Sequence, residues 1–499
     1  MHGAGLLERW FLKGVRRVKR LFPSPSPPPP ERGLLLGFAP HPADPHRFSL
    51  PVYWRWEQRP RHALLVGGSG MGKSMLLRVM MRQDLAQGNG FALFDPHGDL
   101  VEALLAESAA FPDALDRLWL LEPHAPFTLP FNPLSVPEGL PFYPQILTLL
   151  DLFKRSWSDF WGPRVEEVLR ACLITLAEHR LTLVELPLLL TDAPVRRLLT
   201  ASLQHEETRQ FWRHFEHLSP SLQALYAEPV LNRAHRFLSD PTVKALLGSQ
   251  DGIAFADLME EGAILLVNLS KGQLKEVTLL GSLLLAQCYW AALTRLNRPP
   301  HRRRLFTLYL DEFQNFLTDA SHAEDLLAEV RKCFVGLVMV TQCLAFLDRT
   351  LRASVLANTS LQIFFRLNPQ DAGLVSGEIS LANRTAWRQK LLTLPPRCAV
   401  GLLRGESPPS LLRTPDCPDP LDPDLSWRVR ERIARQKGRR KEEVLREIQR
   451  RHHLLRTLAA QGGEKDGRAK SLDRPRRQRG SPNAPRKPAL PFVQEAEPF

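Results

Sequence analysis

The stretch from Arg61 to Leu100 constrains the fold of this sequence more than any other part of the chain. It begins with an apolar run, Ala63–Val66, that predicts a short buried strand. The turn that follows reads GGSGMGKS and leads into a helical pattern. It has the GxxxxGKS spacing of a phosphate-binding loop, in which glycines let backbone N–H groups converge on phosphate oxygens at a helix N-terminus. A purely structural glycine-rich turn is the alternative, and the strand–turn–helix context favours the phosphate site.

The residues of this loop are the candidate cofactor-binding set: Gly67, Gly68, Ser69, Gly70, Met71, Gly72, Lys73 and Ser74. In such loops the lysine reaches the β- and γ-phosphates and the hydroxyl residue binds Mg²⁺. We therefore assign the first role to Lys73 and the second to Ser74, and expect ATP and Mg²⁺ as cofactors.

Composition sets the broad class of the protein. The 499 residues are enough for two or three domains. The six cysteines form no CxxC pair, which favours a reduced cytoplasmic protein over a disulfide framework or a zinc site. No window offers the roughly 20 uncharged apolar residues that a membrane span needs, and the richest stretch, Leu279–Leu293, is too short.

The net charge of +13 is concentrated at one end of the chain. Residues 427–499 contain 21 Lys/Arg and 9 Asp/Glu, a net of +12, so the first 426 residues are near neutral. Residues 427–460 read as a charged helical region, and residues 461–499 as a disordered basic tail. Such a tail can hold nucleic acid by neutralising phosphates. The alternatives are a solvated tail and a docking site for a partner protein.

The first 22 residues form a basic amphipathic segment, with apolar residues at helical spacing and Lys/Arg on the other face. Peripheral contact with a membrane is one interpretation. Docking on another protein surface and a loose basic leader are the others. A proline-rich linker, residues 23–35, separates this segment from the body of the protein.

Eight apolar runs predict strands: Ala63–Val66, Phe91–Phe94, Leu118–Leu121, Ala263–Leu269, Leu305–Leu310, Gly336–Gln342, Leu361–Leu367 and Arg397–Gly405. Their alternation with helices predicts an α/β fold with a mostly parallel sheet covered on both faces. Residues 139–258 read instead as an all-α insertion between residues 36–138 and residues 259–412. We expect the aromatic residues of the insertion to form helix core rather than to stack on bases; they are Trp157, Phe160, Trp161, Phe211, Trp212 and Phe215.

Polar residues follow three of these strands. Asp311 and Glu312 have the Walker B form, in which the first acid holds Mg²⁺ and the second polarises the attacking water. Gln342 can sense the γ-phosphate, or simply cap its strand. Asp95 lies where ligands bind in an open α/β sheet, although a turn-forming Asp-Pro is the favoured interpretation.

Seven segments, taken in order, resemble a known family: RHALLVGGSGMGKS, LFDPHGDL, FNPL, LYLDEFQNF, EVRKCFVGLVMVTQ, NTSLQIFFRLNPQDA and LPPRCAVGLLRG. Together they are similar to the ATPase domain of conjugative coupling proteins of type IV secretion (the TraD/TraG type) and to the wider HerA/FtsK group. The similarity covers about Arg61–Arg404. It implies a RecA-like, DNA-translocating ATPase that works as a homo-oligomeric, usually hexameric ring with ATP between neighbours. Relaxase or secretion-channel proteins are then expected partners.

The resemblance also carries roles over to single residues. It makes Glu312, Lys73 and Gln342 catalytic, and it implies an arginine finger for which Arg366 is preferred and Arg331 is the alternative. Either arginine can equally be a salt-bridging residue. Membrane-bound coupling proteins begin with transmembrane helices, whereas this sequence begins with the basic amphipathic segment. Three functions therefore stay open: a coupling-type DNA motor, a soluble HerA-like DNA helicase or pump, and an ATP-binding scaffold that recruits protein substrates.

Overall fold

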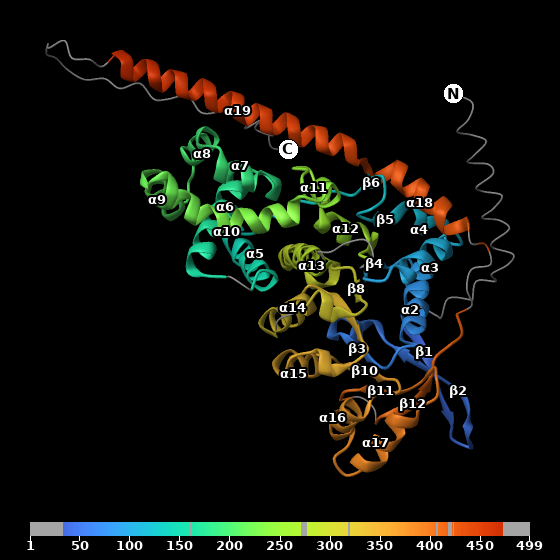
Figure 1. Ribbon diagram of the computed structural model, residues 1–499. Helices are drawn as coiled ribbons and strands as arrows, with labels where there is room; N and C mark the ends of the chain where they lie inside the picture. Colours follow the sequence, from blue (N-terminus) through green and yellow to red (C-terminus); the bar gives the residue numbers. More distant parts are fainter. Residues whose placement is uncertain are drawn as a thin grey trace, which may run out of the picture.

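The computed structural model describes residues 33–158, 161–270, 277–317, 320–405, 408–417, 422 and 424–472. The amphipathic segment 1–22, most of the proline-rich linker and residues 473–499 of the basic tail lie outside them. Eleven strands form one sheet in the order β2-β1-β12-β11-β10-β3-β9-β8-β4-β7-β5. Figure 1 shows this sheet beside a separate group of helices, with the long helix α19 running along the helical group and α18 continuing from it over the sheet.

The eight predicted strands are all present: β3 Ala63–Val66, β4 Gly90–Asp95, β5 Leu118–Leu121, β7 Ile264–Asn268, β8 Phe306–Leu310, β9 Val335–Thr341, β10 Leu361–Phe364 and β11 Cys398–Leu403. Every neighbouring pair from β10 to β5 is parallel. Of these eight strands, only β11, which pairs with β10, runs the other way. The α/β prediction with a mostly parallel sheet is therefore confirmed.

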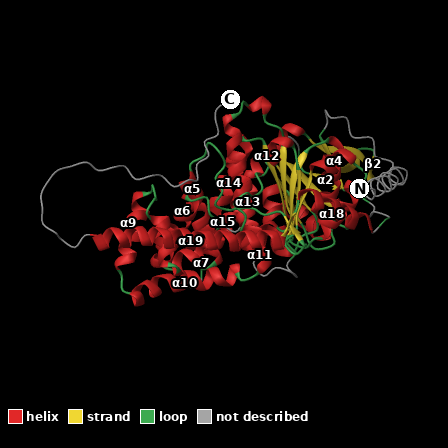
Figure 2. Cartoon of the chain, turned by 90° about the horizontal axis from the view of Figure 1, so that it is seen from above, coloured by secondary structure: helices red, strands yellow, loops and turns green. Residues whose placement is uncertain are grey.

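Helices cover both faces of the sheet, as Figure 2 shows from above. The helices that alternate with the strands are α2 Lys73–Gln87, α3 Asp99–Ser108, α4 Pro112–Arg117, α13 Val277–Thr294, α14 Ala320–Lys332, α15 Arg349–Asn358, α16 Pro369–Ile379 and α17 Arg384–Thr393. Alternate residues of a strand enter different cores. Ala63 and Leu65 join the core formed with α2 and α3, whereas Leu64 and Val66 join the core formed with α13, α14 and the inserted helices.

The sheet is wider than the sequence predicts. A hairpin of β1 Leu34–His41 and β2 Asp44–Trp54, together with β12 Ser410–Arg413, extends it by antiparallel pairing. The linker predicted for residues 23–35 thus gives way to β1 at Leu34. Most of β2 is exposed and contains two prolines, so it lacks the apolar alternation from which a strand is predicted.

Residues 142–261 form helices: α5 Phe142–Ser156, α6 Pro163–Glu178, α7 Leu186–Thr191, α8 Ala193–Thr200, α9 Glu206–His217, α10 Pro220–Leu238, α11 Pro241–Leu247 and α12 Phe255–Glu261. Several prolines of this region begin helices: Ser219 caps α10 just before Pro220, and Asp240 caps α11 just before Pro241, whereas Pro229 lies inside α10. Trp212 and Phe215 are buried, and the Trp212 indole donates to the Thr175 hydroxyl at 2.8 Å. These two rings are core, as expected, while Phe160 lies outside the described residues.

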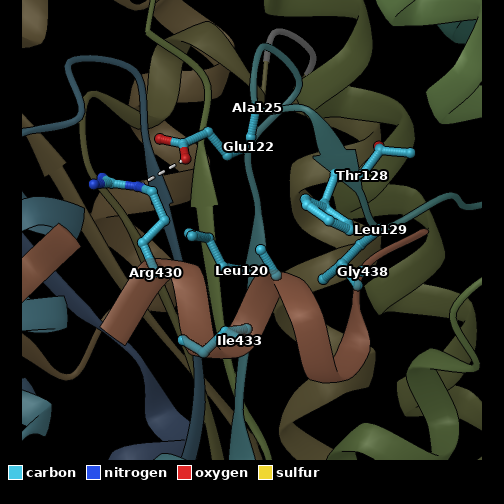
Figure 3. Close-up of a pocket in the computed structure, with 10 residues that line it drawn as sticks. Leu120, Glu122, Ala125, Thr128, Leu129, Arg430, Ile433 and Gly438 are labelled. Atoms are coloured by element: carbon cyan, nitrogen blue, oxygen red, sulfur yellow. Dashed lines mark hydrogen bonds and ion pairs between the residues drawn. The ribbon is translucent and has the colours of Figure 1, made fainter. Parts of the chain in front are cut away.

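Two C-terminal helices, α18 Asp424–Lys437 and α19 Lys441–Leu472, join the two parts of the molecule. Helix α18 packs on α3 and β5, and α19 packs on α8 and α11. Figure 3 shows Arg430 of α18 reaching Glu122 after β5, with Nε 2.9 Å from Oε2. Helix α19 continues to Leu472, whereas we predicted the helical region to end at residue 460.

Among the described residues, one helical stretch, Val277–Asn297, is long and apolar enough to cross a membrane, so the prediction that residues 279–293 are too short a stretch is wrong on length and composition. Its most apolar window is 78% buried within the molecule, where α13 packs on α5, α12 and α14. It is a core helix of the folded protein.

Candidate nucleotide-binding site

The predicted phosphate-binding loop connects β3 to α2 at the carboxyl edge of the parallel strands. Gly70 and Gly72 have φ values of 71° and 112°, which residues with a Cβ rarely adopt. A Cβ on Gly67 would lie 2.5 Å from the Cβ of Phe365. The glycines therefore fix both the turn of the loop and its close approach to the segment after β10.

Both neighbouring strands hold the loop in place. The Gly67 N–H donates to the Thr341 carbonyl at the end of β9, at 3.3 Å. The Gly68 N–H donates to the Arg366 carbonyl just beyond β10, at 3.1 Å. The residues that follow these strands therefore share one edge with the loop.

Lys73 is the first residue of α2 and is 6% exposed. Its ammonium group donates to the carbonyl oxygens of Gly67 at 2.6 Å and Gly68 at 3.1 Å. Burial lowers the pKa of Lys73, and the charges of Glu312 and Asp311 partly oppose that shift. The structure thus brings the predicted lysine and both Walker B acids close enough for their charges to interact.

Asp311 follows β8 and is 5% exposed. Its pKa is raised to about 7, first by burial and then by the charges of Asp95 and Glu312, while the charge of Lys73 lowers it. Asp311 and the groups whose charges act on it comprise three carboxyl groups and one ammonium group, which is a surplus of negative charge around Asp311. A divalent cation removes such a surplus, so the residues present suit Mg²⁺.

Asp95 is fully buried at the end of β4. Its carboxylate accepts the backbone N–H groups of His97, Leu100 and Val101 at 2.9–3.1 Å and so caps the start of α3. The favoured interpretation of a turn-forming residue is correct. The same carboxylate also acts electrostatically on Asp311, which the sequence did not reveal.

Glu312 has a left-handed backbone, with φ 46° and ψ 54°, and is 6% exposed. Its side chain accepts the Gln314 amide at 2.8 Å, and its carbonyl accepts the Asn315 amide at the same distance. A residue without glycine's freedom holds such a conformation only where its surroundings fix it, and these cases gather at functional sites.

The candidates at the other strand ends lie in different places. Gln342 follows Thr341 and is exposed. Arg366 follows Phe365, the residue that packs against Gly67, and is also exposed. Arg331, near the end of α14, acts instead on His62, whose pKa its charge helps to lower. Since His62 precedes β3, Arg331 lies at the opposite edge of the sheet from the loop.

The sequence analysis missed one residue that touches the loop. The Arg397 N–H donates to the Met71 carbonyl at 2.8 Å, immediately before β11. The sequence predicts Arg397 only as the start of a strand, because no local pattern indicates that a strand begins against a loop distant in sequence.

Among the described residues, no group of three or more His, Cys, Asp or Glu side chains is arranged to hold a metal ion. A cavity lies between α18 and the segment that runs from β5 to the short strand β6 Phe127–Thr128, where Leu120, Glu122 and Ile433 line it (Figure 3). Its lining includes none of the predicted nucleotide-binding residues.

Comparison with solved structures places the fold. The unbound monoclinic form of the bacterial conjugative coupling protein TrwBdeltaN70 is 16% identical, with 81% of this chain and 92% of that chain covered and a TM-score of 0.53. The plasmid coupling protein TrwB in complex with ADP and Mg²⁺ is also 16% identical, with 82% of this chain and 94% of that chain covered and a TM-score of 0.52. VirB4 of Thermoanaerobacter pseudethanolicus is 13% identical, with 78% of this chain and 97% of that chain covered and a TM-score of 0.52. At these identities the likeness concerns the fold.

Family comparison is more specific than the structural likeness. No curated protein matches the chain. The family model described as the type IV secretion-system coupling protein DNA-binding domain matches residues 47–372, which is more than half of the sequence. The matched range contains the phosphate-binding loop, the two Walker B acids and the inserted helices. The chain therefore belongs to the type IV secretion-system coupling protein family.

Proposed function

We propose that this protein is an ATP-hydrolysing DNA translocase, the motor of a conjugative or type IV secretion DNA-transfer system. One observation carries the proposal: Lys73, Asp311 and Glu312 converge at the edge of the sheet where the phosphate-binding loop lies, and they leave negative charge there uncompensated. That arrangement suits a magnesium nucleotide. The solved TrwB complex with ADP and Mg²⁺ has the same fold.

Each residue has a role in this proposal. The backbone N–H groups of residues 67–74 bind the phosphates, and Lys73 neutralises the β- and γ-phosphates. Ser74 and Asp311 would hold Mg²⁺, which supplies charge neutralisation and orients the phosphates. Glu312 polarises the attacking water, and Gln342 reports the presence of the γ-phosphate.

The arginine finger is proposed to be Arg366. Its carbonyl accepts the Gly68 N–H, and its side chain is exposed at the carboxyl edge of the sheet, where the phosphate-binding loop lies; we call this the nucleotide edge. Arg331 lies at the opposite edge of the sheet. In a ring of identical subunits an exposed guanidinium at this edge can reach the neighbour's nucleotide. It would then neutralise charge that develops in the transition state.

DNA is the proposed track, single- or double-stranded, because the matched family model is a DNA-binding domain. The protein is proposed to work in the cytoplasm as a homo-oligomeric ring, which is hexameric by family expectation. Residues 1–22 are proposed to give peripheral contact with the inner face of the membrane. Sedimentation with anionic liposomes, with and without residues 1–22, tests that contact and separates this motor from a soluble HerA-like pump.

DNA-dependent turnover tests the central proposal. ATP hydrolysis by the purified full chain is measured alone, with single-stranded DNA and with double-stranded DNA, beside Lys73→Ala. The translocase proposal expects a severalfold stimulation by at least one form of DNA, and no turnover in the variant. Slow turnover that ignores both forms, in a preparation shown to be oligomeric, would favour an ATP-binding scaffold that recruits protein substrates.

A further inference from the structure

Arg397 lies against the phosphate-binding loop at Met71 and Gly72, the two residues before Lys73. Its N–H donates to the Met71 carbonyl at 2.8 Å. A Cβ on Gly72 would lie 3.3 Å from the Arg397 Cα and 3.4 Å from its Cγ. The backbone and side chain of Arg397 therefore pack on the tightest part of the loop.

The backbone of Arg397 is held in an unfavourable conformation. Its φ is 67°, in the left-handed region. For a residue other than glycine this conformation is unfavourable and persists only where the surroundings enforce it. Here the Thr414 N–H donates to the Arg397 carbonyl at 2.9 Å, while Met71 accepts the Arg397 N–H. Glu312, across the same edge, is strained in the same way.

The guanidinium of Arg397 is held by partners that can release it. One nitrogen, Nη2, donates to the Thr414 carbonyl at 3.1 Å, and Nη1 pairs with Asp416. The Arg397 side chain is 30% exposed and that of Asp416 is 81% exposed. Ion pairs this exposed to water contribute little free energy, so a phosphate can compete with Asp416 for the arginine.

We propose that Arg397 is a positioning residue of the nucleotide site. Its N–H holds the Met71–Gly72 turn in the shape that receives phosphates. Its guanidinium, exchanging Asp416 for a phosphate oxygen, adds positive charge beside the nucleotide of the same chain. The inference rests on the proposed nucleotide-binding function and adds a residue to which that function assigned no role.

The test compares two arginines at opposite ends of β11. Arg397→Gly keeps the N–H and accepts a positive φ, so it removes only the side chain. Arg404→Gly is the matched control, because Arg404 also pairs with a partly exposed acid, Glu378 at 2.7 Å, and its side chain is 34% exposed. Binding of a fluorescent ADP analogue and the KM and kcat for ATP are measured for both variants, Arg397→Lys and the wild type.

The expected result is a split between affinity and rate. Arg397→Gly should weaken ADP binding and raise the KM for ATP by about tenfold, with kcat within about twofold, because it removes a charge that acts on bound nucleotide in every state. Arg397→Lys should recover most of the affinity, and Arg404→Gly should bind as the wild type does. A mainly structural side chain would instead lower thermal stability and kcat, and lysine would not restore them.

The failures of the two proposals can be told apart. If the wild type binds ADP, Lys73→Ala does not, and Arg397→Gly matches the wild type, this inference is overturned while the nucleotide site stands. If the wild type does not bind ADP, the proposed function itself fails. Should Arg397→Gly not fold, Arg397→Gln against Arg397→Lys gives the same comparison, and equal affinities would contradict a role for the charge.

Discussion

Two buried carboxyl clusters in this molecule have opposite electrostatics. At the nucleotide edge, Asp311 is pushed toward its neutral form, with a pKa of about 7, by burial and by the nearby Asp95 and Glu312. Between the inserted helices and α19, Glu185 is buried just as deeply, yet its pKa lies below the ordinary value.

The partners explain the difference. Glu185 accepts two bonds from Arg451, at 3.1 and 2.7 Å, and one from His452 at 3.0 Å. The Thr182 backbone N–H and hydroxyl complete its shell. A fully compensated carboxylate holds elements together, here α19 against the start of α7. A carboxyl cluster left short of positive charge is typical of a place where a cation and its ligand bind.

The largest expected effect concerns the source of the remaining positive charge at the nucleotide edge. If Arg366 supplies it across a subunit interface, Arg366→Ala should lower turnover by about 10³-fold. Arg331→Ala, at the other edge, should leave turnover near the wild-type rate. Mixing Arg366→Ala with Lys73→Ala subunits should restore part of the activity, because some interfaces then combine an intact loop with an intact finger. Absence of any restoration in mixed oligomers would contradict action between subunits.

A second prediction compares one glutamate from each cluster. Glu312→Gln should reduce ATP turnover by about 10²-fold or more while nucleotide binding persists, because the amide cannot polarise water as a carboxylate does. Glu185→Gln should leave the turnover rate per folded molecule within about twofold of the wild type. Steady-state hydrolysis and ADP binding on both variants provide the measurement. Equal losses of turnover would erase the distinction between the clusters.

The free energy of unfolding should depend on Glu185 more than on Asp311. Glu185→Gln leaves the buried Arg451 without its counter-charge and should lower the free energy of unfolding by about 3 kcal/mol. Asp311→Asn removes like-charge repulsion and should leave the nucleotide-free protein as stable as the wild type or more so. Chemical denaturation at pH 8 without nucleotide measures both. A large destabilisation by Asp311→Asn would show that its carboxylate is structurally compensated after all.

The two clusters should also respond differently to pH. Asp311 has a pKa of about 7 in the folded chain against an ordinary value of 3.8, so folding favours its proton and the stability of the nucleotide-free protein falls as pH rises from about 4 to 7. Glu185 has the opposite sign: its contribution is present above its ordinary pKa of 4.5 and is lost as pH falls through its lowered value.

The smallest predicted effect follows from the raised pKa of Asp311. Mg²⁺ competes with the Asp311 proton, so magnesium-dependent nucleotide affinity should fall by about tenfold between pH 8 and pH 6. Asp311→Asn should abolish most of that pH dependence. Titration of ADP with and without Mg²⁺ across this range checks both statements, and a flat wild-type profile would argue against Asp311 as a metal ligand.

Much of the nucleotide edge could be predicted because its residues follow local rules. Glycine spacing, short apolar runs and acids at strand ends identify Lys73, Asp311 and Glu312 without knowledge of tertiary structure. The order of the strands cannot be read this way, and neither can Arg397, whose contact with Met71 depends on which strand lies beside β3. The Glu185–Arg451 pair joins residues far apart in the sequence, and a charged helix such as α19 gives no sign that one arginine is buried. The β1–β2 hairpin escaped because its exposed strand lacks an alternating pattern.

Calorimetric titration of ATP into the wild type and Asp311→Asn, each with and without Mg²⁺, tests whether the buried carboxyl edge is a magnesium–nucleotide site. We expect Mg²⁺ to tighten binding to the wild type strongly and to Asp311→Asn hardly at all. Equal tightening of both proteins by Mg²⁺ would contradict this expectation.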